Sequence, residues 1–374
     1  MLTSLNRILA ALLLGVALHA HAQDYRIVGY VGARNANDRW DPGKVDTLIF
    51  AFAGVHNGEV TLDAKAIPRL QGILALKAGH PHLRVMISVG GWGSGGFSEA
   101  AATAKGRQRF ARSAAALVRA QHADGLDVDW EYPGHHESGI ASSEQDRANF
   151  TALLAAVRAE LDKASTRDGR RGTERYALSI AIADAEFVDH VDLAGVDRQI
   201  DWFNMMTYDF VNGLTATTGH HAGLHASALT PPAARTTDRA VRQFLAAGIA
   251  PRKLVIGAAF YGREFAEVDP AHDGLYQHYG HFIAYRGWKK LQSDYIDKNG
   301  YVRHWDAEAQ APFLWNETTR HFVSYEDVES LKAKIAFVRS NRLGGIMYWE
   351  QDEDPDGELL DVLFSGLHEA PAKP

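Results

Sequence analysis

The stretch from residue 124 to residue 131 reads DGLDVDWE, and it decides the fold that we expect for this chain. In a β-strand successive side chains point to opposite faces, so Asp127, Asp129 and Glu131 share one face. The opposite face carries only apolar side chains, those of Leu126, Val128 and Trp130. A strand with a wholly apolar face packs against helices, so its acidic face points into an enclosed space. The alternative is a surface strand with a solvated acidic face, which leaves the apolar side chains unexplained.

The three carboxylates form a column along the strand, with neighbours about 6.6 Å apart. In an enclosed space, desolvation and mutual repulsion force at least one of them to hold a proton near neutral pH. The sequence therefore predicts a carboxylic acid that is kept protonated.

Eight apolar runs along the chain are typical of buried parallel strands. They span residues 25–31, 44–55, 83–89, 124–131, 176–183, 201–210, 253–261 and 344–349. Helical patterns separate them, at residues 63–79, 97–121, 143–163, 188–196, 238–248 and 325–342. This alternation predicts the α/β fold of a closed (β/α)8 TIM barrel. An open doubly wound sheet is the alternative, but residues 29–32 (GYVG) lack the glycine fingerprint it requires.

We expect the barrel to comprise residues 23–263 and 323–367, and residues 368–374 to form a tail. The aromatic-rich segment 264–322 is expected to form a small α+β insertion between strands seven and eight. Such an insertion lies at the C-terminal face of a barrel, where active sites are found.

The N-terminus has the features of a secretory signal peptide over residues 1–22. Arg7 precedes an apolar run at residues 8–18, and Ala20-His21-Ala22 is a small-x-small cleavage site. The run is too short to cross a bilayer comfortably, since about 20 apolar residues are needed. We therefore expect cleavage after Ala22 and a secreted or periplasmic bacterial protein rather than a membrane protein; a buried N-terminal helix is the alternative.

Composition excludes several classes of function. The net charge of -7, without a basic stretch interleaved with aromatics, argues against nucleic acid as a partner. The chain has no Cys, which excludes disulfides and thiolate sites. The histidine pairs at 135–136 and 220–221 lack the spacing of a metal motif. We expect no metal, no cofactor and a monomer.

The position of Glu131 at the C-terminal end of its strand suggests a catalytic acid. A protonated carboxyl beside a carboxylate is the arrangement of a general acid that cleaves a glycosidic bond. Asp129 lies on the same wall as Glu131, so it is badly placed to attack from the opposite face of a sugar. The attacking group is then either a carboxylate across the barrel, such as Asp209, or a group carried by the substrate.

The stretch DGLDVDWE resembles the D-x-x-D-x-D-x-E signature of family-18 glycoside hydrolases, the chitinases and their relatives. Asp124, Asp127, Asp129 and Glu131 occupy its four positions. Supporting matches follow in the family's order: SVGG at 88–91, MTYD at 206–209, YGR at 261–263, and Trp349. The matches span nearly the whole mature chain, and the insertion lies where deep-cleft members carry a small α+β domain.

This resemblance implies substrate-assisted cleavage of β-1,4-linked N-acetylglucosamine in chitin or chito-oligosaccharides, with retention and without a cofactor. Glu131 would protonate the leaving oxygen while the 2-acetamido carbonyl of the sugar attacks the anomeric carbon. Asp129 would orient the acetamide N–H, moving between Asp127 and Glu131. Tyr208 would donate a hydrogen bond to the acetamide oxygen.

Further residues are expected to bind the sugar or to support the site. Trp349 would be the floor on which the sugar stacks, and Trp92 could serve a neighbouring subsite. Arg263 and Asp209 are expected to contact the substrate, although they could instead belong to a buried ion pair. The remaining expected substrate contacts are Met206, Tyr261, Gly91 and Tyr132. The residues expected to support the site from behind are Tyr30, Ser88, Asp124 and Phe52.

One departure and two other functions remain open. Residues 212–227 contain no Trp, which puts their contribution to the product side in doubt. A chitin-binding lectin on the same barrel would be expected to lack the acid, yet Glu131 is present. An endo-N-acetylglucosaminidase that acts on N-glycans differs in loop shape, which the sequence does not reveal.

Overall fold

The structure is a computed structural model that describes residues 25–33 and 39–368. The signal peptide predicted at residues 1–22 lies outside the described residues, as do residues 369–374 of the expected tail.

Eight parallel strands form a closed barrel. They are β1 (Arg26–Gly32), β2 (Thr47–His56), β4 (Arg84–Gly90), β5 (Gly125–Asp129), β6 (Ala177–Ile182), β7 (Trp202–Met205), β8 (Leu254–Ala259) and β14 (Gly345–Trp349). Each strand pairs with the next, and β1 pairs with both β2 and β14, which closes the ring. The short strand β3 (Glu59–Thr61) pairs with β2 in an antiparallel hairpin. The predicted (β/α)8 barrel is confirmed, and the open sheet is excluded.

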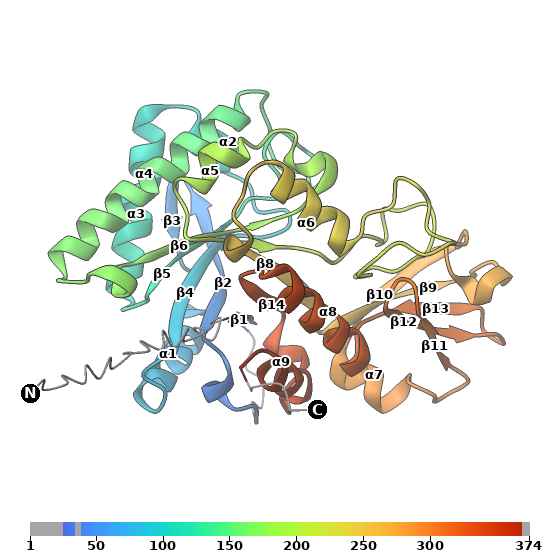
Figure 1. The fold of residues 1–374 in the computed structure, drawn as a ribbon. Helices are drawn as coiled ribbons and strands as arrows, with labels where there is room; N and C mark the ends of the chain where they lie inside the picture. Colours follow the sequence, from blue (N-terminus) through green and yellow to red (C-terminus); the bar gives the residue numbers. More distant parts are fainter. Residues whose placement is uncertain (1–24, 34–38, 369–374) are drawn as a thin grey trace, which may run out of the picture.

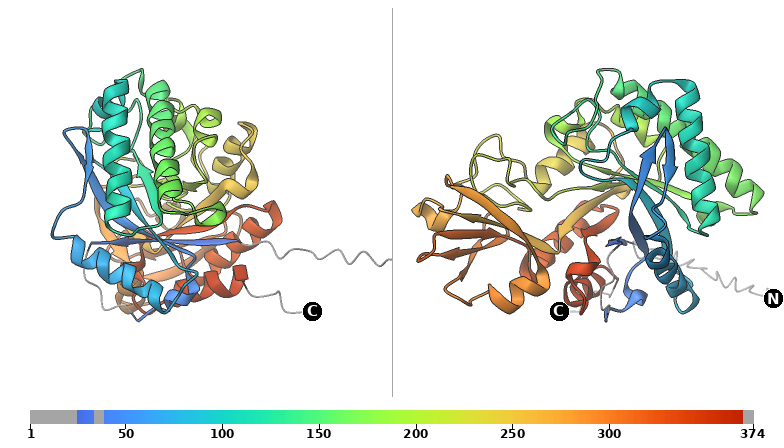
Figure 2. Two further views of the ribbon diagram at one scale, coloured as in Figure 1. Left: turned by 90° about the vertical axis from the view of Figure 1, so that its left-hand side faces the viewer. Right: turned by 180° about the vertical axis from the view of Figure 1, so that it is seen from behind.

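Helices cover the outside of the barrel (Figures 1 and 2). They are α1 (Ile67–Ala75), α2 (Phe97–Ala101), α3 (Ala104–Ala120), α4 (Asp146–Arg167), α5 (Leu193–Asp197), α6 (Thr237–Ala246), α8 (Val328–Asn341) and α9 (Glu358–His368). Over the part of the chain that the structure describes, none is long and apolar enough to cross a membrane. The prediction of a single helix at 97–121 is wrong, because the first helix ends before Thr103 and a second one begins after it. The Thr103 side chain caps α3 by accepting from Gly106 N at 3.0 Å.

The chain between β8 and α8 forms a second sheet with one α-helix. Its elements are β9 (Tyr261–Ala266), β10 (His281–Gly287), α7 (Trp288–Asp294), β11 (Val302–Asp306), β12 (Ala311–Asn316) and β13 (His321–Ser324). The five strands pair antiparallel in the order β10-β9-β13-β12-β11. This sheet lies beside the barrel (Figure 1). Because β9 begins at Tyr261, Arg263 is a residue of the second sheet.

A buried carboxylate, Glu264, joins several elements of this second sheet. Four groups surround it: Arg286 Nε at 2.7 Å, Tyr301 OH at 2.7 Å, His321 Nδ1 at 3.0 Å and Tyr295 OH at 3.2 Å. Burial would raise the pKa of Glu264, but these partners hold it below its ordinary value. The side chain therefore remains an anion that ties β9 to β10, β13 and the chain after α7.

A second buried ion pair fixes α8 to the barrel. Lys334 Nζ donates to Glu326 at 2.9 Å and to the carbonyl of Gly257 in β8 at 2.8 Å. Glu326 in turn accepts from Ala259 N at 2.7 Å. Both side chains are 1% exposed, so each charge depends on the other.

We predict that Lys334→Met lowers the free energy of unfolding by about 3–5 kcal/mol, because it leaves Glu326 buried without its cation. Urea unfolding followed by circular dichroism measures this loss. Lys332→Met is the matched control, since Lys332 is exposed on the same helix. Adding Glu326→Gln to Lys334→Met should recover part of the loss, because a neutral amide can still accept from Ala259 N. Equal effects of the two lysine variants would contradict the prediction.

Candidate active site

Strand β5 places the acidic column as its alternation requires. Leu126 and Val128 lie in the apolar layer between the strands and the helices. Asp127 and Asp129 are 0% and 4% exposed, and the half-buried Glu131 follows the C-terminal end of the strand. The acidic face therefore points into the barrel, as the apolar face of the strand indicates.

Asp127 is held by donors from four other strands. They are Tyr30 OH at 2.9 Å, Ser88 Oγ at 2.8 Å, Ser179 Oγ at 2.6 Å and Asn204 Nδ2 at 3.2 Å. Burial raises the pKa of Asp127, and these donors oppose the rise by stabilising the carboxylate. Tyr30 and Ser88 thus lie where they were expected.

Ser179 and Asn204 were not among the expected site residues. A signal for both was available, since each is a polar residue at an inward position of an otherwise apolar strand, ALSIAI and WFNM. A buried polar side chain needs a partner, and the inner aspartate is that partner.

Asp129 lies between Asp127 and Glu131, and no donor in the described part of the chain bonds to its Oδ1 to offset their negative charges. Its Oδ1 is buried without a hydrogen-bond partner among the described residues. Burial and the charges of Glu131 and Asp127 raise the pKa of Asp129 well above its ordinary value. Asp129 and Glu131 therefore both favour the protonated carboxyl more than a solvated acid does, and each charge opposes ionisation of the other.

The pKa of Glu131 is shifted toward neutral pH. Burial raises the pKa of Glu131 to about 7, the neighbouring Tyr132 side chain opposes this, and the charge of Asp209 adds to it. A carboxyl that is protonated up to about pH 7 is suited to donate a proton to a leaving group.

The glycines of the SVGG motif make room for this column. A Cβ on Gly90 would lie 1.9 Å from the carbonyl oxygen of Asp129. Gly91 has a φ of 93°, and a Cβ there would lie 2.9 Å from the ring of Phe52. Gly91 N also donates to Asp129 O at 2.9 Å, so the turn holds β5 at the site.

Asp209, at the exit of β7, forms an ion pair with Arg263 of β9. Arg263 Nε donates to Asp209 Oδ1 at 2.8 Å, and its Nη2 donates to Oδ2. Tyr261 OH donates to the same Oδ1 at 2.7 Å, and His221 Nδ1 lies 3.6 Å away. Burial would raise the pKa of Asp209, but His221 and Arg263 hold it well below its ordinary value. The ion pair that the sequence left as an alternative is therefore present.

The expected aromatic floor is assembled at the ends of three strands. Trp349 stacks on Phe52, with ring centroids 5.6 Å apart and planes at 18°, and its ring lies 5.7 Å from Tyr30. Trp92 is 54% exposed and meets the edge of Tyr132 at 6.3 Å. The solvent-facing Trp92 is thus separated from the packed Trp349.

Tyr208 and Met206 are buried inside the barrel. The Tyr208 hydroxyl lies 3.7 Å from the sulfur of Met347. Burial and the charge of Asp129 raise the pKa of Tyr208 well above its ordinary value, so its hydroxyl keeps its proton. It can therefore donate a hydrogen bond.

Asp124 does not support the site, contrary to expectation. It precedes β5 and so lies at the opposite end of the strand from Glu131. There it pairs with Lys77 at 2.5 Å and Arg170 at 2.9 Å and accepts from Val85 N at 2.9 Å. Its place in the motif reflects the packing of the N-terminal end of the barrel.

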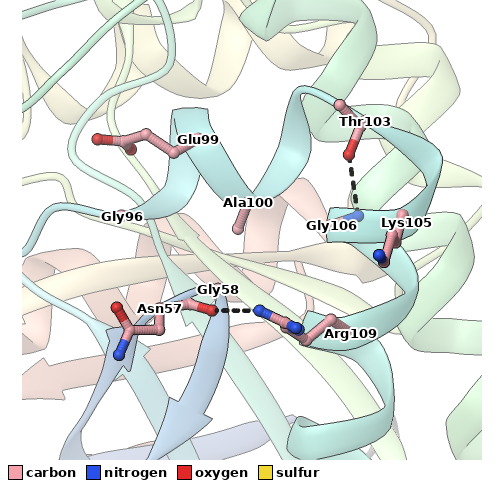
Figure 3. Close-up of a pocket in the computed structure, with 9 residues that line it drawn as sticks. All are labelled: Asn57, Gly58, Gly96, Glu99, Ala100, Thr103, Lys105, Gly106 and Arg109. Atoms are coloured by element: carbon pink, nitrogen blue, oxygen red, sulfur yellow. Dashed lines mark hydrogen bonds between the residues drawn. The ribbon is translucent and has the colours of Figure 1, made fainter.

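A pocket of about 540 Å³ lies away from this site, on the outside of the barrel (Figure 3). The turn between β2 and β3 and the helices α2 and α3 line it, with Arg109 donating to the carbonyl of Asn57 at 3.1 Å. None of the expected site residues lines this pocket. Within residues 25–33 and 39–368, no group of three His, Asp or Glu side chains is placed to hold a metal ion.

Comparison with known proteins gives a consistent family assignment. The model of the family described as "Glycosyl hydrolases family 18" matches residues 26–354. Chitinase A1 of Niallia circulans is 33% identical, over 92% of this chain and 59% of its own length. Chitotriosidase-1 of Mus musculus is 34% identical, over 84% of this chain and 68% of its own length. The structure of a glycoside hydrolase family 18 N-acetylglucosaminidase from Paenibacillus barengoltzii superposes with a TM-score of 0.85 at 38% identity, covering 91% of this chain and 99% of that one.

We predict that Ser179→Ala lowers the free energy of unfolding by about 1.5–3 kcal/mol, because it removes a donor from a buried carboxylate. In an Asp127→Asn background the same change should have a smaller effect. Denaturant unfolding of the four proteins measures the coupling. Ser165→Ala is the control, since this buried serine donates to the carbonyl of Leu161 and should combine additively with Asp127→Asn. Additivity of Ser179→Ala with Asp127→Asn would contradict the prediction.

Proposed function

The chain belongs to glycosyl hydrolases family 18, and from this premise we propose that it cleaves β-1,4 linkages between N-acetylglucosamine units in chitin or chito-oligosaccharides. The observation that carries the proposal is Glu131, a carboxyl at the C-terminal end of β5 whose pKa is raised to about 7 beside the buried Asp129. The chain spans 59% of the length of Chitinase A1, so the substrate is proposed from the shared part only.

In the proposed reaction Glu131 donates its proton to the glycosidic oxygen as the bond from that oxygen to the anomeric carbon breaks. The carbonyl oxygen of the sugar's own 2-acetamido group attacks the anomeric carbon and forms an oxazolinium ion. The Glu131 carboxylate then takes a proton from the water that attacks the anomeric carbon and opens this ion. The two attacks each invert that carbon, so the overall configuration is retained.

Asp129 is proposed to hold the acetamide N–H during this attack. Its Oδ1 is buried without a partner among the described residues, so an incoming N–H would relieve an unsatisfied polar atom. Asp127 keeps its four donors, and its charge helps to raise the pKa of Asp129. Tyr208, which keeps its proton, is proposed to donate to the acetamide oxygen.

The state of Asp209 favours a nucleophile from the substrate over one from the protein. Arg263 and Tyr261 both donate to this carboxylate, which lowers its basicity and fixes its direction. An anion held in this way is suited to orienting substrate groups and to raising the pKa of Glu131. It is poorly suited to attack on carbon.

A second candidate is an N-acetylglucosaminidase that removes N-acetylglucosamine units from oligosaccharides. The observation in its favour is the similarity to the Paenibacillus barengoltzii enzyme over 99% of that chain. Product analysis on a defined N-acetylglucosamine hexamer separates the two candidates, since release of monomer alone would favour the second. A chitin-binding lectin is not favoured, because the acid is in place.

We predict that kcat/KM falls as the pH rises through about 7, because the active form of Glu131 is protonated below its pKa and the proton is lost above it. Glu131→Gln should lower kcat by about 10²- to 10⁴-fold and abolish this pH dependence, while oligosaccharide binding persists. Initial rates on a chromogenic chito-oligosaccharide and calorimetric titration measure the two properties. Glu137→Gln, on the exposed loop after β5, is the matched control. A Glu131→Gln variant that keeps more than about 1% of the parent kcat would contradict the assignment of Glu131 as general acid.

We predict that replacing the 2-acetamido group by a hydroxyl, as in a β-1,4-glucan of equal length, lowers kcat by at least about 100-fold, because the intramolecular nucleophile is lost. Comparing kcat at saturating substrate separates this loss from weaker binding. A thiazoline analogue of the oxazolinium ion should inhibit competitively. Equal turnover of glucan and chito-oligosaccharide would rule out substrate assistance.

A further inference from the structure

Arg235 lies between two phenylalanine rings beside the site and was not among the expected site residues. Its guanidinium carbon is 5.1 Å from the ring centre of Phe187 and 4.9 Å from that of Phe210. Nε donates to Asp184 Oδ1 at 2.8 Å, and Nη2 donates to the same oxygen. The side chains of Arg235 and Asp184 are 16% and 4% exposed, so water screens this ion pair little. A planar cation held by a carboxylate and by two rings has few positions open to it.

The residues in this cluster come from different exits of the barrel. Asp184 and Phe187 follow β6, and Phe210 follows β7. Arg235 ends the long connection from β7 to α6, which Figure 1 shows reaching toward the second sheet. The ring of Phe187 also lies 4.7 Å from that of Tyr132, which follows β5. One guanidinium thus links the exits of three neighbouring strands.

Two neighbours of this cluster act on Glu131. Tyr132 directly follows Glu131 in the chain, and its side chain lowers the pKa of that carboxyl against the effect of burial. Phe210 directly follows Asp209, whose charge raises the same pKa. A shift of either ring would therefore move a group on which the proton of Glu131 depends.

We propose that Arg235 is a positioning residue: by packing between Phe187 and Phe210 while it holds Asp184, it keeps the Tyr132 side chain in place beside Glu131. The proposal rests on the role of Glu131 proposed above. It assigns a purpose to a cation, a buried carboxylate and two rings that do not belong to the column of acids.

Several titratable groups face this region, and a test must separate their effects on the pH profile. Glu131 faces Asp129, Asp209 and Tyr132, and Arg235 faces Asp184. His135 lies 6.5 Å from the ring of Tyr132 and 5.5 Å from that of Phe187, with His190 5.6 Å beyond it. Because an imidazole lies this close to Tyr132 and Phe187, any shift must persist when His135 is replaced.

The test compares Arg235→Met and Arg235→Lys with the parent enzyme in kcat, KM and the pH dependence of kcat/KM. Arg235→Met should lower kcat by about 10- to 100-fold, as expected for a misplaced catalytic group, with a smaller change in KM. The alkaline limb should move to higher pH, because burial then raises the pKa of Glu131 without the opposing effect of Tyr132. Arg235→Lys should reproduce most of the shift, since it keeps the charge but not the planar contact with both rings. Both effects should persist in a His135→Gln background.

A further variant, Tyr132→Phe, tests whether the effect of Arg235 on Glu131 passes through Tyr132. Tyr132→Phe alone should move the limb in the same direction, and Arg235→Met should add nothing in that background. Arg119→Met is the matched control, because it breaks another Arg–Asp pair, with Asp168, that is more exposed and lies at the end of α3 that leads into the N-terminal end of β5, whereas Glu131 follows the C-terminal end. Thermal unfolding of each variant shows that the fold is kept, and Asp184→Asn replaces Arg235→Met if that variant does not fold.

The proposal is overturned if folded Arg235→Met keeps the parent pH profile and kcat, or if it shifts the limb equally with and without the Tyr132 hydroxyl. A carbon-13 NMR titration of labelled glutamate, with Glu131→Gln to assign the signal, reads the same shift without turnover. If the protein proves inactive on chito-oligosaccharides but this signal moves in Arg235→Met, the proposed function fails while the positioning role stands.

Discussion

The buried carboxylate of Asp127 is the constraint on which the interior of the barrel depends. An anion with no exposure to water must receive hydrogen bonds from the protein, and four strands besides its own supply them, through Tyr30, Ser88, Ser179 and Asn204. These donors fix the register in which the strands meet at this level. The requirement to satisfy one charge thus explains polar residues on strands that are otherwise apolar.

The rest of the site follows from the asymmetry within the acidic column. Asp127 has donors, whereas Asp129 has an oxygen without a partner among the described residues and two acidic neighbours, so the pKa of Asp129 is raised well above its ordinary value. Asp209 contributes an ion at the rim that remains charged because Arg263 and Tyr261 hold it. The proposed proton donor Glu131 and the ion of Asp209 therefore follow two different strands, β5 and β7, rather than forming one pair of acids.

The fold was largely predictable because alternation and strand length determine which faces are apolar. The catalytic column followed from the same alternation, and the family resemblance supplied Tyr208 and Trp349. The partners of Asp127 on β6 and β7, the imidazole of His221 and the guanidinium of Arg235 depend on which loops meet in space, which periodicity does not encode. Asp124 shows the opposite error, since a residue inside the motif belongs to the far end of the barrel. The break at Thr103 was missed because a capping residue interrupts an alanine-rich pattern only through its side chain.

A single residue, Phe260, separates β8 of the barrel from β9 of the second sheet. Because β9 carries Tyr261 and Arg263, the second sheet cannot be removed without changing the site. Excision or exchange at this junction would take away the countercharge of Asp209 as well. A replacement sheet would keep Asp209 paired in this protein only if its first strand carried a tyrosine and an arginine in the register of Tyr261 and Arg263.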